Sequence, residues 1–253
     1  MNRIYQFVRW SSLQRKGAKL RRSNAQNVMM ARDLARLHAN YTALLRNNTE
    51  GQLGIASYAV IKHLTVLLQL RDYENYRHGV RVARLSGILA RQMRLDSSYC
   101  AMLELATPLH DVGILALPDS SKSEADTFPR KYFENHTLLG ESILKSDDHI
   151  LSISSQIARS HHEHFDGSGY PDRLIGDGIP LGARIVAVAD RFDDLVCGLH
   201  GNSALSAEEA YKVIFDEYGR QFDPKVVRSL DQGKEEFMMA VAADAQTNNL
   251  RGS

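Results

Sequence analysis

Apolar residues recur along most of this chain at the three- and four-residue spacing of amphipathic helices. Between residues 55 and 70, for example, Ile61, Leu64 and Leu68 share one helical face. No stretch shows the convincing alternation of apolar and polar residues that marks a strand. The pattern therefore predicts an all-α protein. Further helices are expected at residues 76–93, 97–110, 130–145, 148–161, 181–197 and 206–218, and from Asp223 onward.

The first 50 residues show a second pattern. Five apolar side chains follow the spacing of a coiled-coil seam, namely Met30, Leu34, Leu37, Tyr41 and Leu44. We expect residues 1–50 to form a basic helical segment that makes a homodimer, although an amphipathic helix packed on its own domain would satisfy the same spacing. A polar break before Gly51 starts the main domain, residues 51–234. Residues 235–253 are polar and are expected to form a flexible tail.

Charge and cysteine content narrow the possible functions. Residues 1–32 carry eight of the 31 Lys and Arg residues and no acid, so the remainder holds 23 basic and 30 acidic residues, a net charge of −7. An acidic body disfavours a nucleic-acid polymer as substrate, while the basic arm suits an anionic surface, an acidic partner or a solvated linker. Two distant cysteines fit a reducing cytoplasm. No apolar run approaches the roughly 20 residues of a membrane helix, and no signal peptide is apparent.

Histidine and acidic residues that could bind metal ions recur along the chain, although the pair His161 and His162 alone would fit surface histidines before a turn. The candidate ligands are Glu74, His78, His110, Asp111, His136, His161, His162 and Asp190. Such a set without cysteine favours iron or manganese over structural zinc. Glu74 lies four residues before His78, so both face the same side of a helix. Adjacent helical residues point about 100° apart, which suggests that His161 and His162 would suit two different ions.

The segments that carry these residues resemble one family. They read LHDVGILALPD, NHTLLGESIL, ARSHHEHFDGSGYP and IPLGARIVAVADRFDDL, in this order and with a literal Gly-Tyr-Pro. Over roughly residues 55–232 the chain resembles the HD-GYP family, a branch of the HD metal-dependent phosphohydrolases that degrades cyclic di-GMP. The resemblance implies an HD-type helical bundle with a two-metal centre. Some members hold a third metal with a glutamate at the position of Glu74, so two or three ions are expected.

The same resemblance implies a cyclic di-GMP phosphodiesterase whose catalytic centre includes His110 and Asp111. Two ions about 3.5–4 Å apart lower the pKa of a bridging water and clamp the phosphoryl oxygens of an in-line displacement. Asp72 matches a position that meets guanine in some members, and the loop of Gly169, Tyr170 and Pro171 is expected to wall the pocket. Tyr170 would otherwise be a packing aromatic. Helices like the N-terminal one often join signalling domains in this family, which implies a signalling protein as a further partner.

Three cationic positions of the family hold uncharged residues here. Ile114 replaces the lysine of an HDIGK segment, while Leu199 and Asn202 occupy the arginine positions of an RPYR-like segment. Each lost charged hydrogen bond to phosphate would cost roughly 1.5–3 kcal/mol. The sequence therefore leaves open a phosphodiesterase of low activity, a non-catalytic metal-bound sensor or interaction module, and a hydrolase of a smaller phosphoester.

Overall fold

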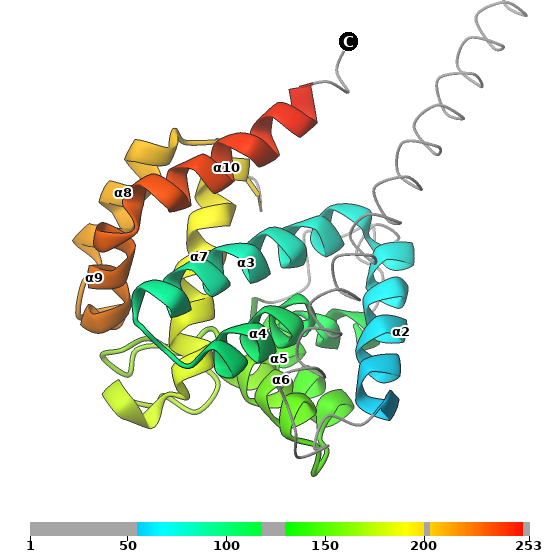
Figure 1. The fold of residues 1–253 in the computed structure, drawn as a ribbon. Coiled ribbons are helices and arrows are strands. Elements are labelled where there is room, and N and C mark those ends of the chain that lie inside the picture. The colour runs from blue at the N-terminus through cyan, green and yellow to red at the C-terminus, as the bar shows by residue number, and fades with distance from the viewer. Residues whose placement is uncertain (1–54, 118–129, 200–202, 250–253) are drawn as a thin grey trace, which may run out of the picture. The chain divides into compact units, whose positions relative to one another are not determined.

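The computed structural model describes residues 55–117, 130–199 and 203–249, and the heptad seam and the boundary at Gly51 lie outside them. The helices are α2 (Ile55–Arg71), α3 (Tyr73–Gln92), α4 (Ser97–Ala106), α5 (Arg130–Leu144), α6 (His149–Ser160), α7 (Leu181–Cys197), α8 (Ala207–Asp216), α9 (Pro224–Gln232) and α10 (Lys234–Asn249), with short 3-10 segments η1 (Thr107–Leu109), η2 (Val112–Ala116) and η4 (Gly176–Gly178) (Figure 1). The described residues contain no strand, which confirms the all-α prediction. None of their helices is long and apolar enough to cross a membrane.

Helix α3 is the element around which the described helices pack. It contacts α2, α4 and α7 along its length, and it also contacts α9 and α10 (Figure 1). Its inward face carries Val82, Leu85 and Leu89, all buried, and the facing side of α7 contributes Ile185 and Phe192, also fully buried. These apolar faces supply the core that carries the polar residues of the metal centre.

Local capping signals explain where the helices begin, including α3, which starts three residues before the predicted position 76. Asp72 caps α3 by accepting hydrogen bonds from the backbone N–H groups of Glu74 and Asn75. Ser206 and Glu209 form the predicted capping box of α8. Each bond satisfies a backbone donor that the first turn of a helix leaves unpaired.

The C-terminal segment departs from the prediction. Residues 234–249 form helix α10 rather than a flexible tail, and α9 is therefore not the last helix of the core. Phe237 is fully buried, with its ring edge-on to Phe192 at a centroid distance of 4.8 Å. The carbonyl of Ala240 accepts a hydrogen bond from Arg84 of α3. Phe237 and Ala240, one turn apart and both buried, are the residues through which α10 packs on the core.

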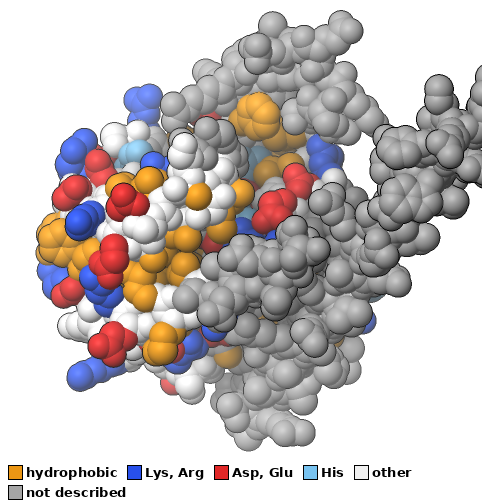
Figure 2. All heavy atoms as spheres, turned by 90° about the horizontal axis from the view of Figure 1, so that it is seen from above, with side chains coloured by type: hydrophobic (Ala, Val, Ile, Leu, Met, Phe, Trp, Pro, Cys, Tyr) orange, Lys and Arg blue, Asp and Glu red, His pale blue; other side chains and the backbone are white. Residues whose placement is uncertain are grey.

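The visible surface mixes both signs of charge. Figure 2 shows Lys, Arg, Asp and Glu side chains interspersed with apolar ones over one face of the described part. No single sign of charge dominates this face of the described part.

Candidate metal centre

Five segments that lie far apart in the sequence bring their histidines and acids together. His78 comes from α3, His110 and Asp111 from the turn between η1 and η2, His136 from α5, His161 and His162 from the end of α6, and Asp190 from α7. Their ligand atoms fall into groups within which all atoms lie no more than 4.8 Å apart. The groups are Asp111 with His136, His161 and His162; His78 with His110 and Asp111; and His78 with Asp190 and Asp194.

A close backbone approach brings Asp111 next to α5. A β-carbon at Gly113 would lie 1.9 Å from the carbonyl oxygen of His136 and 2.6 Å from the amide nitrogen of Gly140. Only glycine allows η2 and α5 to come this close. The glycine of the HD segment therefore sets the distance between the Asp111 carboxylate and the His136 ring.

The two oxygens of Asp111 face different histidines. Oδ1 lies 3.3 Å from His136 Nε2 and 3.5 Å from His161 Nε2, and these two nitrogens are 3.4 Å apart. Oδ2 lies 3.6 Å from His110 Nε2. Two ligands about 2.1 Å from one ion stand about 3–3.4 Å apart, so the Oδ1 set already has nearly the spacing of ligands around a cation. Asp111 is thus placed to serve two groups at once.

The other half of the centre lies between α3 and α7. His78 Nε2 is 2.8 Å from Asp190 Oδ1, and His110 Nε2 is 3.6 Å from the same oxygen. His110 Nε2 is buried and makes no hydrogen bond to any residue that the structure describes. A buried nitrogen without a hydrogen bond, facing two carboxylates, is where a metal ligand is expected. The donor set therefore fits divalent cations.

The orientation of three of these rings is set by the backbone. The Nδ1 atom of His110 donates to the carbonyl oxygen of Thr107, and that of His161 donates to the carbonyl oxygen of Ile157, each at a distance of 3.0 Å. The Nδ1 atom of His136 donates to a carbonyl oxygen of its own helix. Each bond selects the tautomer whose Nε2 lone pair is available. Each Nε2 atom then lies 3.3–3.6 Å from an oxygen of Asp111.

The electrostatics favour the protonation states that metals require. Burial opposes charge on Asp111 and Asp190, but neighbouring histidines outweigh it and hold both carboxyl pKa values well below their usual range. Burial lowers the pKa of His136 and, more strongly, that of His162. Ionised carboxylates and neutral imidazoles are the ligating forms. His78 and His110 differ. Burial lowers the pKa of His78, yet hydrogen bonds to Asp190 and Asp193 raise it well above its usual range. Burial also lowers the pKa of His110, but the charge of Asp111 and the nearby Asp190 raise it above its usual value.

The histidine pair does not behave as the helix argument predicts. His161 is the C-cap of α6, and His162 follows in the turn beyond it. Their ring centroids are 4.0 Å apart, and both rings belong to the Asp111 group. This grouping gives no support to the expectation that they face two different ions, which stays a prediction. The helical angle of about 100° between neighbours does not apply where the helix has already ended.

Glu74 and Asp72 lie outside these groups. The Glu74 side chain is 53% exposed and forms ion pairs with Arg81 at 3.3 Å and Arg77 at 3.5 Å. Asp72 is exposed and caps α3. Metal binding by Glu74 and substrate contact by Asp72 stay predictions, and a third ion at Glu74 would compete with two arginines for the same carboxylate.

Two aspartates of α7 also belong to the site, although the sequence did not predict them. Asp194, four residues after Asp190 and on the same helical face, joins His78 and Asp190 in one group. Asp193 accepts a hydrogen bond from His78 Nδ1 at 2.8 Å and pairs with the buried Arg81. The spacing along α7 could have suggested Asp194. The partners of Asp193 lie on another helix, and no local pattern reveals them.

The Gly-Tyr-Pro loop folds over the histidine pair. The Tyr170 ring stacks on His162 with centroids 4.8 Å apart. A β-carbon at Gly169 would lie 2.2 Å from the amide nitrogen of His164, so the loop needs glycine there. The buried carboxylate of Glu163 accepts hydrogen bonds from the backbone N–H groups of Asp172 and Leu174. These contacts place Tyr170 at the edge of the centre, with the cis Tyr170–Pro171 bond beside it.

Two of the three uncharged positions named from the sequence lie in the described part of the chain. Ile114 belongs to η2, which follows Asp111 directly, and is partly buried. Leu199 follows α7 and is also partly buried, while Asn202 lies outside the described residues. Arg71 donates to the carbonyl oxygens of Leu115 and Leu117, so this cation holds η2 in place.

Comparison with known proteins identifies the class to which this fold and site belong. The HD domain family matches residues 62–226, so the chain belongs to that family. Its Gly-Tyr-Pro loop beside the histidine pair and its curated relatives place it in the HD-GYP branch.

The curated relatives are named as phosphodiesterases of cyclic dinucleotides. A cyclic di-GMP phosphodiesterase of Thermotoga maritima is 36% identical over 176 residues, which cover 68% of this chain and 48% of the relative. The 3'3'-cGAMP-specific phosphodiesterase 2 of Vibrio cholerae is 35% identical over 186 residues, which cover 72% of this chain and 36% of the relative. The chain thus spans about half or less of the length of these proteins.

A solved structure confirms the fold. The crystal structure of a cyclic GMP-AMP-specific phosphodiesterase of V. cholerae superposes with a TM-score of 0.54 at 19% identity, covering 74% of this chain and 52% of that one. At this identity the likeness establishes the arrangement of helices and nothing about substrate.

Proposed function

We propose that this chain is a metal-dependent phosphodiesterase that hydrolyses a cyclic dinucleotide, with cyclic di-GMP as the first candidate. The observation that carries the proposal is the Asp111 carboxylate, of which one oxygen faces His136 and His161 and the other faces His110, all three buried. One ion would be held by Asp111 with His136, His161 and His162, and the other by Asp111 with His78, His110 and Asp190. Divalent ions bound there would lower the pKa of water and neutralise charge on the phosphoryl oxygens.

The protein's own residues would bind and orient rather than attack. The backbone acceptors of His110, His136 and His161 keep the rings in one tautomer and orientation, which preorganises the centre. Tyr170, stacked on His162, offers an aromatic face at the rim where a base of the substrate can stack. No side-chain nucleophile is needed in this arrangement.

The metal centre does not by itself select one cyclic dinucleotide. Cyclic di-GMP and 3'3'-cGAMP both contain two phosphodiester bonds and differ in one base, so the metal centre can serve either. The uncharged Ile114 and Leu199 deprive the phosphates of two cationic partners. We therefore expect slow turnover and weak binding, with the divalent ions supplying most of the attraction to phosphate.

A non-catalytic metal-bound module is the second candidate. The same uncharged positions favour it, because a domain that only senses nucleotide or contacts a partner does not need to stabilise a transition state. The intact set of buried ligands supports the enzyme instead.

One assay separates these functions. Protein prepared without oxygen and loaded with iron or manganese would be incubated with cyclic di-GMP, 3'3'-cGAMP and a generic phosphodiester, and the products resolved by chromatography. Asp111→Ala is the matched control, which should lose metal by elemental analysis while keeping a helical circular dichroism spectrum. Hydrolysis of a cyclic dinucleotide by the wild type alone supports the enzyme. If the wild type carries its full complement of metal and cleaves none of the three substrates, the non-catalytic metal-bound module is the remaining function.

A further inference from the structure

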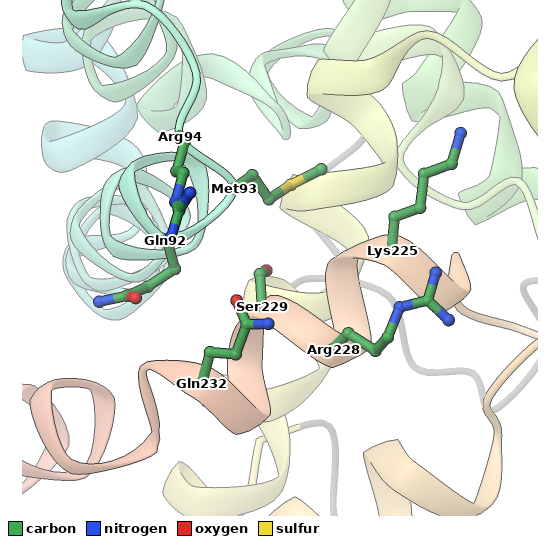
Figure 3. Close-up of a pocket in the computed structure, with 7 residues that line it drawn as sticks. All are labelled: Gln92, Met93, Arg94, Lys225, Arg228, Ser229 and Gln232. Carbon is green, nitrogen blue, oxygen red and sulfur yellow. The ribbon is translucent and has the colours of Figure 1, made fainter.

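A basic groove lies at the end of α3, away from the metal centre. It has a volume of about 490 Å³, and its walls include Gln92, Met93 and Arg94 from the end of α3 and Lys225, Arg228 and Gln232 from α9. Figure 3 shows the two groups on opposite walls. Three of the lining residues are cations and none is an acid. Gln92 is fourteen residues beyond His78 on the same helix, or about 21 Å along its axis.

Arg94 has a backbone conformation that normally belongs to glycine. Its φ is 57°, and its N–H donates to the carbonyl oxygen of Arg91 to close the end of α3. A residue with a β-carbon is disfavoured in this left-handed region, and helices commonly place glycine there. The arginine that stands here in place of glycine adds an exposed guanidinium to the wall of the groove.

The two cations of α9 lie at positions that are locally unfavourable for positive charge. Lys225 is the second residue of the helix, where the helix dipole disfavours a positive charge. Arg228 lies three residues later, so the two like charges are neighbours on one face. Lys225 is 62% exposed and approaches Asp177 at 3.6 Å. Arg228 donates to the hydroxyl of Tyr218, which leaves most of its five N–H donors for another acceptor.

We infer that this groove binds an extended, acidic segment of a partner protein. The guanidinium and ammonium groups are exposed and lie on opposite walls, so they match negative charges spaced along a chain better than a single phosphate, which requires converging donors. Gln92 and Gln232 add amide groups, although the Gln92 amide donates to Glu236 at 3.2 Å. Met93 adds an adaptable apolar surface. Charge of this kind at a groove governs partner choice and association rate.

Binding can be tested with a defined probe on the full chain. A fluorescein-labelled peptide of about eight glutamates would be titrated by fluorescence anisotropy at low ionic strength and again in about 0.15 M salt. The double variant Lys225→Gln/Arg228→Gln should weaken binding about fivefold, and Arg94→Gly about two- to fivefold. Affinity should fall with added salt for the wild type and much less for the double variant.

Arg173→Gly is the matched control for Arg94→Gly. Arg173 is exposed and has the same φ of 57°, but it does not line the groove. Both glycine variants should keep the wild-type Tm within about 2 °C, because glycine adopts this conformation freely, and only Arg94→Gly should lose affinity. The inference is overturned if the wild type does not bind the peptide or if the groove variants bind as well as Arg173→Gly. Pyrophosphate or GMP that displaces the probe at a lower concentration than unlabelled peptide would assign the groove to a phosphate ligand instead.

Discussion

Replacing Asp193 with asparagine should destabilise the fold and loosen the metal centre together. Asp193 is 4% exposed and accepts hydrogen bonds from Arg81 Nε at 2.7 Å and Nη2 at 2.8 Å, as well as from His78 Nδ1 at 2.8 Å. Arg81 is itself only 7% exposed. The substitution would leave this guanidinium buried, with Glu74 at 3.3 Å as its remaining carboxylate partner in the described structure.

The magnitude follows from this geometry. Removing one partner of a buried ion pair costs about 3–5 kcal/mol, because the other charge stays buried without compensation. The asparagine oxygen can still accept one hydrogen bond, and Glu74 remains, so we expect a loss near the lower limit, about 3 kcal/mol. For a protein of this size the Tm would fall by about 6–12 °C. The remaining oxygen cannot serve Arg81 and His78 as the carboxylate does, so the weaker orientation of His78 should lower metal affinity about 10- to 100-fold.

Urea unfolding of the metal-free protein and manganese titration of the folded protein would measure the two effects. Asp172→Asn is a matched control, since Arg159 Nε and Nη2 contact Asp172 at 2.6 and 2.8 Å in the same bidentate geometry. That pair is about one-third exposed, so its loss should cost no more than about 1 kcal/mol. Equal losses in the two variants, or an unchanged manganese affinity in Asp193→Asn, would refute the reasoning.

Three further predictions address the dimer, the loop and the substrate. The full chain should be a dimer and a shortened chain starting at Gly51 a monomer by light scattering; a full-length monomer at tens of micromolar would contradict the heptad assignment. Glu163→Ala should expose the Gly-Tyr-Pro loop to faster amide exchange and cost about 1–3 kcal/mol in urea unfolding, because two backbone N–H groups lose a buried acceptor; unchanged exchange would show that the loop is held by other contacts. Ile114→Lys with Leu199→Arg should raise the affinity for cyclic di-GMP at least tenfold by calorimetry, whereas submicromolar binding by the wild type would show that other residues already replace the missing cations.

Short-range sequence patterns were sufficient to predict the helices, with the exception of α10. The periodicity of apolar residues around Leu85 and Leu89 predicts α3, and the capping box at Ser206 and Glu209 predicts the start of α8. These signals are local, because a helix is stabilised by contacts three and four residues apart. Helix α10 was missed for the complementary reason. Its burial depends on a contact with a distant part of the chain, because Phe237 packs against Phe192 of α7.

For the metal centre, too, the sequence determined one part and the tertiary structure another. The sequence alone determined which segments carry candidate ligands, since residue type and motif spacing are written in the chain. Only the tertiary structure decided how they are grouped: it put His161 and His162 in one set with Asp111, and paired Glu74 with Arg77 and Arg81. It also brought Asp193, more than a hundred residues along the chain, into contact with His78. Ion pairs and shared ligands depend on distances between helices, and those distances are set by the packing of the core, which no local pattern encodes.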